Sequence, residues 1–188
     1  MGTRHLICVF LDKKYKVAQY GQWDGYPQGQ GVDILNFLHG LFANQDKVLE
    51  FTRKVEKISW LSNEERSATW DKKRAQKYPE LSRDTGSKIL SLIQDSAEPL
   101  KLRDRLDFSE DSLFCEWCYV IDFDKNTFEV YEGSNRQRLD ESERFYNDSP
   151  CGVNDYYPVK HKYSFDLNNI LDLTENEFLS KTESKDDE

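Results

Sequence analysis

Two strand–turn–strand patterns, one near the start of the chain and one in its second half, constrain the fold most. Residues 4–11 and 15–23 are rich in β-branched and aromatic residues and flank the polar turn 12–14. Residues 113–123 and 128–133 repeat this pattern around the turn 124–127. Such residues favour strands, and a short polar turn between two runs of them is typical of a β-hairpin. The sequence therefore predicts a hairpin at each place, and residues 159–165 as a further strand.

Helical patterns fill the stretch between the two hairpins. Apolar residues recur at the spacing of one helical face over 32–42 and again over 48–58. Ser62 and Glu65 have the spacing of a capping box, which predicts a third, polar helix ending before Pro79. Asp84 is the expected N-cap of a fourth helix, which Pro99 terminates. A short helical piece is expected at 168–173.

This order of elements predicts an α+β fold, with an antiparallel sheet built from the N- and C-terminal hairpins and helices packed on it. Residues 1–179 are expected to form a single domain. Residues 134–157 are polar and are interpreted as a long surface excursion. The acidic residues 180–188 are expected to be a disordered tail.

The net charge, the apolar runs and the cysteine content limit the expected partners and the expected cellular location. The formal net charge of -9 argues against binding of nucleic acid or of an anionic membrane. The uninterrupted apolar run from Leu6 to Leu11 is too short for a membrane span or a secretory signal. Four cysteines without such a signal are typical of reduced thiols. The expected location is the cytoplasm, and the expected partner is a small molecule or another protein.

The segment 20–31, Tyr-Gly-Gln-Trp-Asp-Gly-Tyr-Pro-Gln-Gly-Gln-Gly, is the most unusual part of the sequence. It joins the end of a strand to the start of a helix, where backbone N–H groups and the helix dipole can hold an anion. Its glycines allow close approach of a ligand, and its aromatic residues offer flat walls. Residues 24–31 contain too many helix and strand breakers for regular structure and are expected to be a loop. The predicted ligand-binding residues are Tyr20, Trp23, Gly25, Tyr26, Gly29 and Gly31.

A structural interpretation of the same segment has equal standing. Asp24-Gly25 and Pro27 can form two turns while the aromatic side chains cover the core. The glycine spacing lacks the third glycine and the later acidic residue of a dinucleotide-binding motif. No nucleotide cofactor is expected.

The start of the chain, Gly-Thr-Arg followed by an apolar strand and YGQWDGYPQGQG, resembles a group of small uncharacterised proteins from phages, bacteria and fungi. That group shares a Thr-Arg start and a W/F-D-G-Y-P loop. The resemblance is strong over residues 3–38 and weaker at 84–86 and 119–133. It implies a shared domain and brings no activity with it.

A looser resemblance is to N-terminal-nucleophile hydrolases, in which a Cys, Ser or Thr begins the first strand and its own amine acts as the base. It implies an amide hydrolase with Thr3, Arg4 and Asp24 around one pocket. The departure from that pattern is that Thr3 becomes the first residue only if both Met1 and Gly2 are removed.

The other motifs are weaker. Asp84-Thr85-Gly86 matches the tripeptide of aspartic proteases, but it occurs once and precedes a helix. Cys115 and Cys118 have the spacing of a metal or redox motif, yet residues three apart on a strand face opposite ways, so buried thiols are favoured. The histidines are too scattered for a ligand set, and no metal is expected.

Two classes of function remain. The chain is either a ligand- or partner-binding module that uses the segment 20–31, or a hydrolase centred on Thr3, Arg4 and Asp24. It lacks paired carboxylates, a histidine-centred triad and a metal cluster in its sequence pattern, and this favours the binding module.

Overall fold

The chain folds around one five-stranded sheet. The structure, a computed structural model, describes residues 2–68, 78–147 and 155–183. The strands are β1 (His5–Leu11), β2 (Lys14–Gly21), β3 (Ser59–Trp60), β4 (Lys101–Leu102), β5 (Trp117–Asp122), β6 (Thr127–Glu132) and β7 (Lys160–Asp166). The α-helices are α1 (Val32–Phe42), α2 (Gln45–Glu56), α3 (Asn63–Ala68), α5 (Lys88–Asp95) and α6 (Glu175–Thr182). Short helical turns are η1 (Pro27–Gly31), η2 (Pro79–Leu81), η3 (Leu106–Glu110) and η4 (Leu167–Asp172).

The sheet has the strand order β2-β1-β5-β6-β7. The hairpins β1–β2 and β5–β6 are antiparallel, as is the pair β6–β7. The two hairpins meet through β1 and β5, which run parallel. Strands β3 and β4 form a separate small parallel pair. The predicted α+β fold is confirmed, with a parallel pair at the centre of an otherwise antiparallel sheet.

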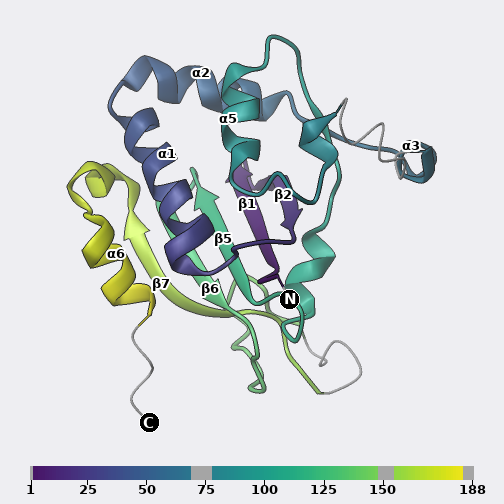
Figure 1. The fold of residues 1–188 in the computed structure, drawn as a ribbon, viewed down its shortest axis with the longest axis vertical. Helices are drawn as coiled ribbons and strands as arrows, with labels where there is room; N and C mark the ends of the chain where they lie inside the picture. Colours follow the sequence, from purple (N-terminus) through teal and green to yellow (C-terminus); the bar gives the residue numbers. More distant parts are fainter. Residues whose placement is uncertain (1, 69–77, 148–154, 184–188) are drawn as a thin grey trace.

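Helices cover one face of the sheet (Figure 1). Alternate residues of β1, among them Ile7 and Val9, pack with Tyr119 and Phe128 against the apolar faces of α1, α2, α5 and α6. Phe51 of α2 is fully buried in this layer. This helix-side core is the larger of the two apolar clusters, and it fixes the start of α1 above the sheet.

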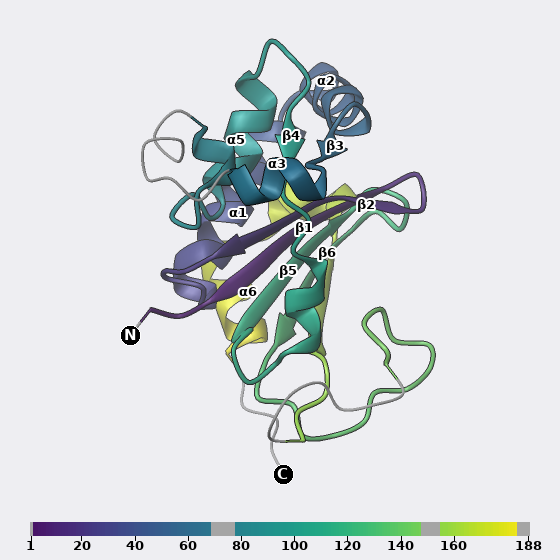
Figure 2. The ribbon, with the colours of Figure 1, turned by 90° about the vertical axis from the view of Figure 1, so that its right-hand side faces the viewer.

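Segments without long helices cover the opposite face (Figure 2). There Leu6 and Cys8 pack with Val120 and Tyr131, and the residues that close this second core lie outside the sheet strands. They include Leu106, Phe108, Cys115, Leu139, Phe145 and Val159. The described part of the predicted excursion 134–157 is therefore packed against the sheet, while residues 148–154 of it lie outside the described residues.

The two helix starts predicted from capping residues had different outcomes. The Ser62 capping box is confirmed: the backbone N–H of Glu65 donates to Ser62 Oγ, and the N–H of Ser62 donates to Glu65 Oε2. The predicted N-cap at Asp84 is wrong, because α5 begins at Lys88 with Ser87 before it. The Asp84 carboxylate instead accepts a hydrogen bond from the indole of Trp23.

The C-terminal elements differ from the expectation in detail. The helical piece expected at 168–173 is the 3-10 helix η4, and α6 follows it with a capping box formed by Thr174 and Glu177. α6 continues to Thr182, which is fully buried, so the first residues of the predicted tail are helical. Residues 184–188 lie outside the described residues. Among the described helices, none is long and apolar enough to cross a membrane.

Candidate functional site

The connection between β2 and α1 is more regular than its glycine content suggests. Pro27–Gly31 forms a π-helical turn that runs directly into α1. Proline suits the first turn of a helix, since the N–H it lacks would have no helical partner there. The N–H of Gln30 donates to the Asp24 carbonyl at 2.9 Å and closes the turn. The expectation that 24–31 is irregular throughout is therefore wrong for residues 27–31.

The connection rests directly on the start of β1. The backbone N–H of Gly25 donates to the Thr3 carbonyl at 3.0 Å, and the buried Tyr119 hydroxyl donates to the Gly25 carbonyl at 2.8 Å. A Cβ on residue 25 would lie 2.8 Å from the Thr3 oxygen. Only glycine allows this contact, so the glycine brings the loop down onto the strand.

A second segment, residues 82–87, holds the loop from the side. The backbone N–H of Gln22 donates to the Arg83 carbonyl at 3.0 Å. The indole N–H of Trp23 donates to Asp84 Oδ1 at 2.8 Å. Two segments about sixty residues apart in the chain thus form one rigid unit, and both carry the residues on which the first resemblance was based.

Gly86 completes this junction. It has φ +52°, and a Cβ there would lie 2.3 Å from the side-chain oxygen of Gln30. That oxygen accepts a hydrogen bond of 2.6 Å from the N–H of Ser87. Positive φ and close approach are the two conditions that glycine satisfies best. Position 86 is therefore fixed by the junction between the two segments.

The exposed side chains of this junction form what we call the loop surface. Its members are Trp23, Asp24, Tyr26, Arg83 and Asp84, all of which are exposed. Trp23 is 47% exposed and Tyr26 is 40% exposed, which is unusual for side chains of this size. The Tyr26 hydroxyl lies 3.3 Å from Asp24 Oδ1, and this neighbouring carboxylate raises the pKa of Tyr26. Asp24 has φ +55°, so the turn directs its side chain from a strained backbone position.

Arg4 and Tyr20 lie away from the loop surface. The Arg4 guanidinium carbon is 4.5 Å from the centre of the Phe114 ring, in the segment before β5. Tyr20 pairs with Leu6 across β1–β2, on the opposite face from the helices, and packs edge-on against Phe108. The structure thus brings Thr3 and Asp24 together with Gly25 but not with the side chains of Arg4 and Tyr20.

Gly29 and Gly31 make close contacts within the protein. A Cβ on Gly29 would lie 2.3 Å from the Asp24 carbonyl oxygen. A Cβ on Gly31 would lie 3.0 Å from the Phe178 ring of α6. Both glycines therefore let the π-helical turn pack against its neighbours, and the room they create is already filled by the chain.

His5 is a residue of this region that the sequence reasoning did not select. Its imidazole is fully buried beneath the loop, and a Cβ on Gly21 would lie 2.1 Å from its Nε2 atom. Neither ring nitrogen has a hydrogen-bond partner among the described residues. Burial lowers the pKa of His5 to about 4, and the Thr3 backbone and the Asp24 carboxylate offset only part of this effect. The ring is therefore neutral at physiological pH.

The alternation of side chains along the strand could have identified His5. It lies two residues before Ile7 on one strand, so it faces the helix-side core. A histidine among alternating apolar residues places a polar ring where water is excluded. Such a ring either has a hydrogen-bond partner or has a lowered pKa.

The three cysteines that the structure describes are buried, as expected, but their arrangement corrects one part of the prediction. Cys115 and Cys118 pack in the same cluster together with Cys8. Cys115 precedes β5, so the strand rule that would place it opposite Cys118 does not apply. Burial raises the pKa of both Cys115 and Cys118 well above the ordinary value, so these thiols are protonated. Cys151 lies outside the described residues. Within ranges 2–68, 78–147 and 155–183, no cluster of three or more His, Cys, Asp or Glu residues is arranged to hold a metal ion.

Comparison with protein-family models, with curated proteins and with solved structures found no match to this chain.

Proposed function

We propose that this chain is a binding domain, and that the loop surface recognises a positively charged group of a ligand or of a partner protein. The observation that carries this proposal is the pair of exposed aromatic rings, Trp23 and Tyr26, in the same turn as the exposed Asp24, whose Oδ1 lies 3.3 Å from the Tyr26 hydroxyl. The rest of the support comes from the rigidity of the loop and from the charge of the chain.

Aromatic faces next to carboxylates suit a cation. A guanidinium or ammonium group gains electrostatic energy over the face of Trp or Tyr, about 0.5–1 kcal/mol at an exposed site. A carboxylate beside the rings adds a charge-assisted hydrogen bond. The loop surface offers Asp24 and Asp84 for this purpose. The Arg83 Nε lies 3.9 Å from Asp84 Oδ1 and partly offsets the negative charge of that carboxylate. Asp24 is therefore the principal acceptor.

The loop is also arranged before any ligand arrives. The backbone of residues 22–30 is bonded to Thr3, to Arg83 and to the buried Tyr119 hydroxyl. The Trp23 indole is held by its hydrogen bond to Asp84. Rigid side chains lose little conformational entropy on binding, which increases affinity. The net charge of -9 further attracts positively charged partners over a distance.

The test is a titration of the protein into fluorescein-labelled hexa-arginine and hexaglutamate peptides, followed by fluorescence anisotropy. We expect binding of hexa-arginine, with the affinity lowered about fivefold to tenfold in Trp23→Ala and in Asp24→Asn, as expected for the loss of about 1 kcal/mol. Asparagine tolerates positive φ, so Asp24→Asn removes the charge and keeps the turn.

Two control variants separate the loop surface from general acidity. Phe114→Ala removes an aromatic ring that is 41% exposed elsewhere on the molecule. Glu98→Gln removes one exposed negative charge far along the chain. Neither should change the affinity by more than about twofold. Equal losses in Glu98→Gln and Asp24→Asn would show unspecific attraction to an acidic protein and would refute the proposal.

One observation favours a second candidate, the amide hydrolase. Thr3 lies against the Asp24-Gly25 turn through its carbonyl, and the neutral His5 imidazole lies in the same region. This activity needs Thr3 as the first residue. The intact mass of the purified protein tests it: loss of Met1 and Gly2 supports the hydrolase, and an N-terminus at either of those residues excludes this mechanism.

A further inference from the structure

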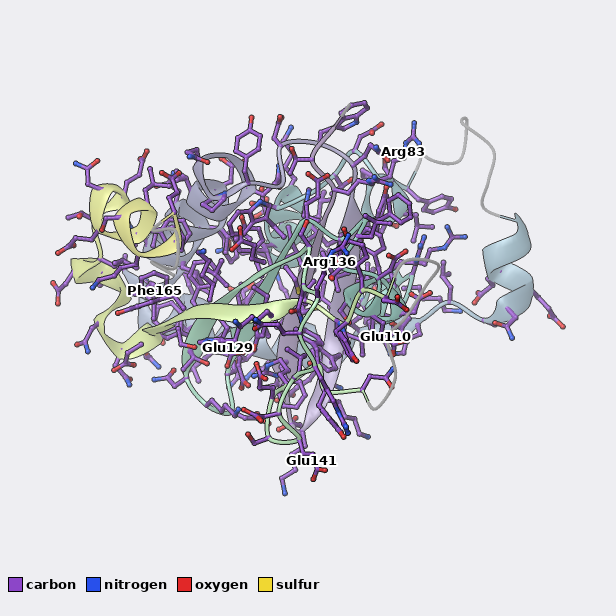
Figure 3. The ribbon with its side chains drawn as sticks, turned by 90° about the horizontal axis from the view of Figure 1, so that it is seen from below. Arg83, Glu110, Glu129, Arg136, Glu141 and Phe165 are labelled. Atoms are coloured by element: carbon purple, nitrogen blue, oxygen red, sulfur yellow. The ribbon has the colours of Figure 1, made fainter. Side chains whose placement is uncertain are left out.

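A pocket at the ends of β6 and β7 lies apart from the loop surface. Its walls are the last residue of β6, the segment 133–137 and the first residues of β7. The lining residues are Glu132, Gly133, Ser134, Asn135, Arg136, Gln137, Lys160, His161 and Lys162. The cavity volume is about 310 Å³, at the lower end of the range for small-molecule sites. Figure 3 views this end of the molecule and labels Arg136.

The pocket is positively charged in a chain that carries a net charge of -9. Arg136, Lys160 and Lys162 line it, and Glu132 is the sole carboxylate among its lining residues. Lys162 pairs with Glu132 at 2.7 Å, and its side chain is only 10% exposed. Arg136 and Lys160 therefore remain as the cations that Glu132 does not neutralise. Their combined charge matches that of a phosphate monoester, which carries up to two negative charges near neutral pH.

The floor of the pocket is held rigidly. The side chain of the buried Asn135 donates from Nδ2 to the Pro158 carbonyl at 2.8 Å. Its Oδ1 accepts from the N–H of Gln137 at 2.9 Å. Ser134 has φ +55°, and its N–H donates to the Ser112 carbonyl at 2.7 Å. The backbone of 134–137 is thus fixed by segments on both sides.

The two cations keep donors for a ligand. The Arg136 guanidinium stacks on the Tyr156 ring at 4.7 Å, and Nη2 donates to the Tyr156 hydroxyl at 3.0 Å. This bond uses one of its five N–H groups. The Lys160 ammonium donates to Gln137 Oε1 at 3.4 Å, a long hydrogen bond that uses one of its three N–H groups. Both residues line the same cavity, so their remaining donors face one binding volume.

We propose that this pocket binds the phosphate group of a small phosphorylated molecule, with Arg136 and Lys160 as its principal ligands. Arginine binds phosphate in a fork of two N–H groups, and lysine acts as a point charge beside it. The remaining volume accommodates the organic part of the molecule. This site does not depend on the loop surface, and its ligand has the opposite charge.

The experiment is isothermal titration calorimetry with inorganic phosphate, ribose 5-phosphate and succinate. We expect ribose 5-phosphate to bind, with the affinity about tenfold or more lower in Arg136→Gln and in Lys160→Gln, as expected for the loss of a charge-assisted hydrogen bond. Both residues are exposed, so the folded state should persist, and circular dichroism melting of each variant checks this. Lys88→Gln, an exposed lysine on α5, is the matched control and should change the affinity by less than about twofold.

The relative affinities of the three compounds distinguish the possible ligand classes. Tighter binding of ribose 5-phosphate than of inorganic phosphate supports an organic phosphate ligand, whereas equal affinities overturn the organic part of the proposal and leave a site for free phosphate. Succinate binding as tightly as ribose 5-phosphate overturns the choice of phosphate over carboxylate. Absence of binding by all three, or an equal loss in Lys88→Gln, overturns the site. Trp23→Ala should leave these affinities unchanged, so failure here is distinct from failure of the loop-surface proposal.

Discussion

At the scale of single residues, His5 is the clearest case of a side chain whose environment sets its chemistry. The ordinary pKa of histidine is 6.5, and burial lowers that of His5 to about 4. Between these two values the unfolded chain binds a proton that the folded chain does not. This contribution to stability is therefore complete above pH 6.5 and is lost as the pH falls toward 4.

Replacing this ring by one that does not titrate tests the assignment. Between pH 7 and pH 4, proton uptake by unfolded His5 lowers the free energy of unfolding of the wild type. In His5→Phe this decrease should be smaller by about 3 kcal/mol. Urea denaturation at a series of pH values measures the slope, which is independent of any packing change. A slope in His5→Phe equal to that of the wild type would mean that His5 is not buried as a neutral ring.

Single residues were predicted best where the reason is local. The Ser62 capping box depends on a spacing of three residues and is present. Asp84 had the local chemistry of an N-cap, yet its partner is Trp23, far away in the sequence. Aspartate serves both purposes equally well, and the choice is made by the approach of two distant segments.

At the scale of elements, a buried ion network holds the excursion 134–147 on the sheet. Arg144 donates from Nε to Glu129 Oε2 at 2.7 Å and from Nη2 to Glu129 Oε1 at 2.9 Å, and Nη2 also donates to Asp122. Tyr131 donates to Glu129 at 2.6 Å. Burial alone raises the pKa of Glu129, but the hydrogen bonds from Arg144 and Tyr131 outweigh it, and the pKa is lowered. Both carboxylates belong to strands, so one arginine fixes the whole segment.

Removal of this arginine should be costly. Arg144→Met leaves Asp122 and Glu129 buried without their cation and should lower the free energy of unfolding by about 3–5 kcal/mol. Lys101→Met removes a cation from the exposed pair with Glu65 and should cost less than about 1 kcal/mol. Urea denaturation at pH 7 compares the two. Similar values for both variants would show that the network contributes no more than a surface pair.

Strands and helices could be predicted from the sequence, whereas the pairing of strands far apart in the chain could not. The hairpins around 12–14 and 124–127 were predicted because turn chemistry and alternation are local properties. The parallel contact between β1 and β5, and the small pair β3–β4, join strands far apart in the chain. No local pattern distinguishes these partners, since either edge of each hairpin presents the same backbone groups. The helical turn 27–31 was missed because its two glycines and its proline are typical of a loop, and the contacts that stabilise it involve residues outside the turn.

At the scale of the whole molecule, the two proposed sites share one end of the sheet. Gly21, His5, Trp117, Glu132 and Lys160 lie in register across β2, β1, β5, β6 and β7. Adjacent strands are about 4.8 Å apart, so β6 and β7 lie roughly 10–14 Å from β1. The acidic loop surface and the basic pocket are thus separate neighbours, and the parallel β1–β5 pair is what sets their spacing.

We propose that a cationic partner binds at the loop surface, and nuclear magnetic resonance can locate its binding site residue by residue. On addition of hexa-arginine to the ¹⁵N-labelled protein, we expect the largest changes in the amide signals of residues 22–30 and 82–87 and in the indole signal of Trp23, because these groups form one rigid unit. Changes spread evenly over the acidic residues, or confined to other parts of the molecule, would contradict it.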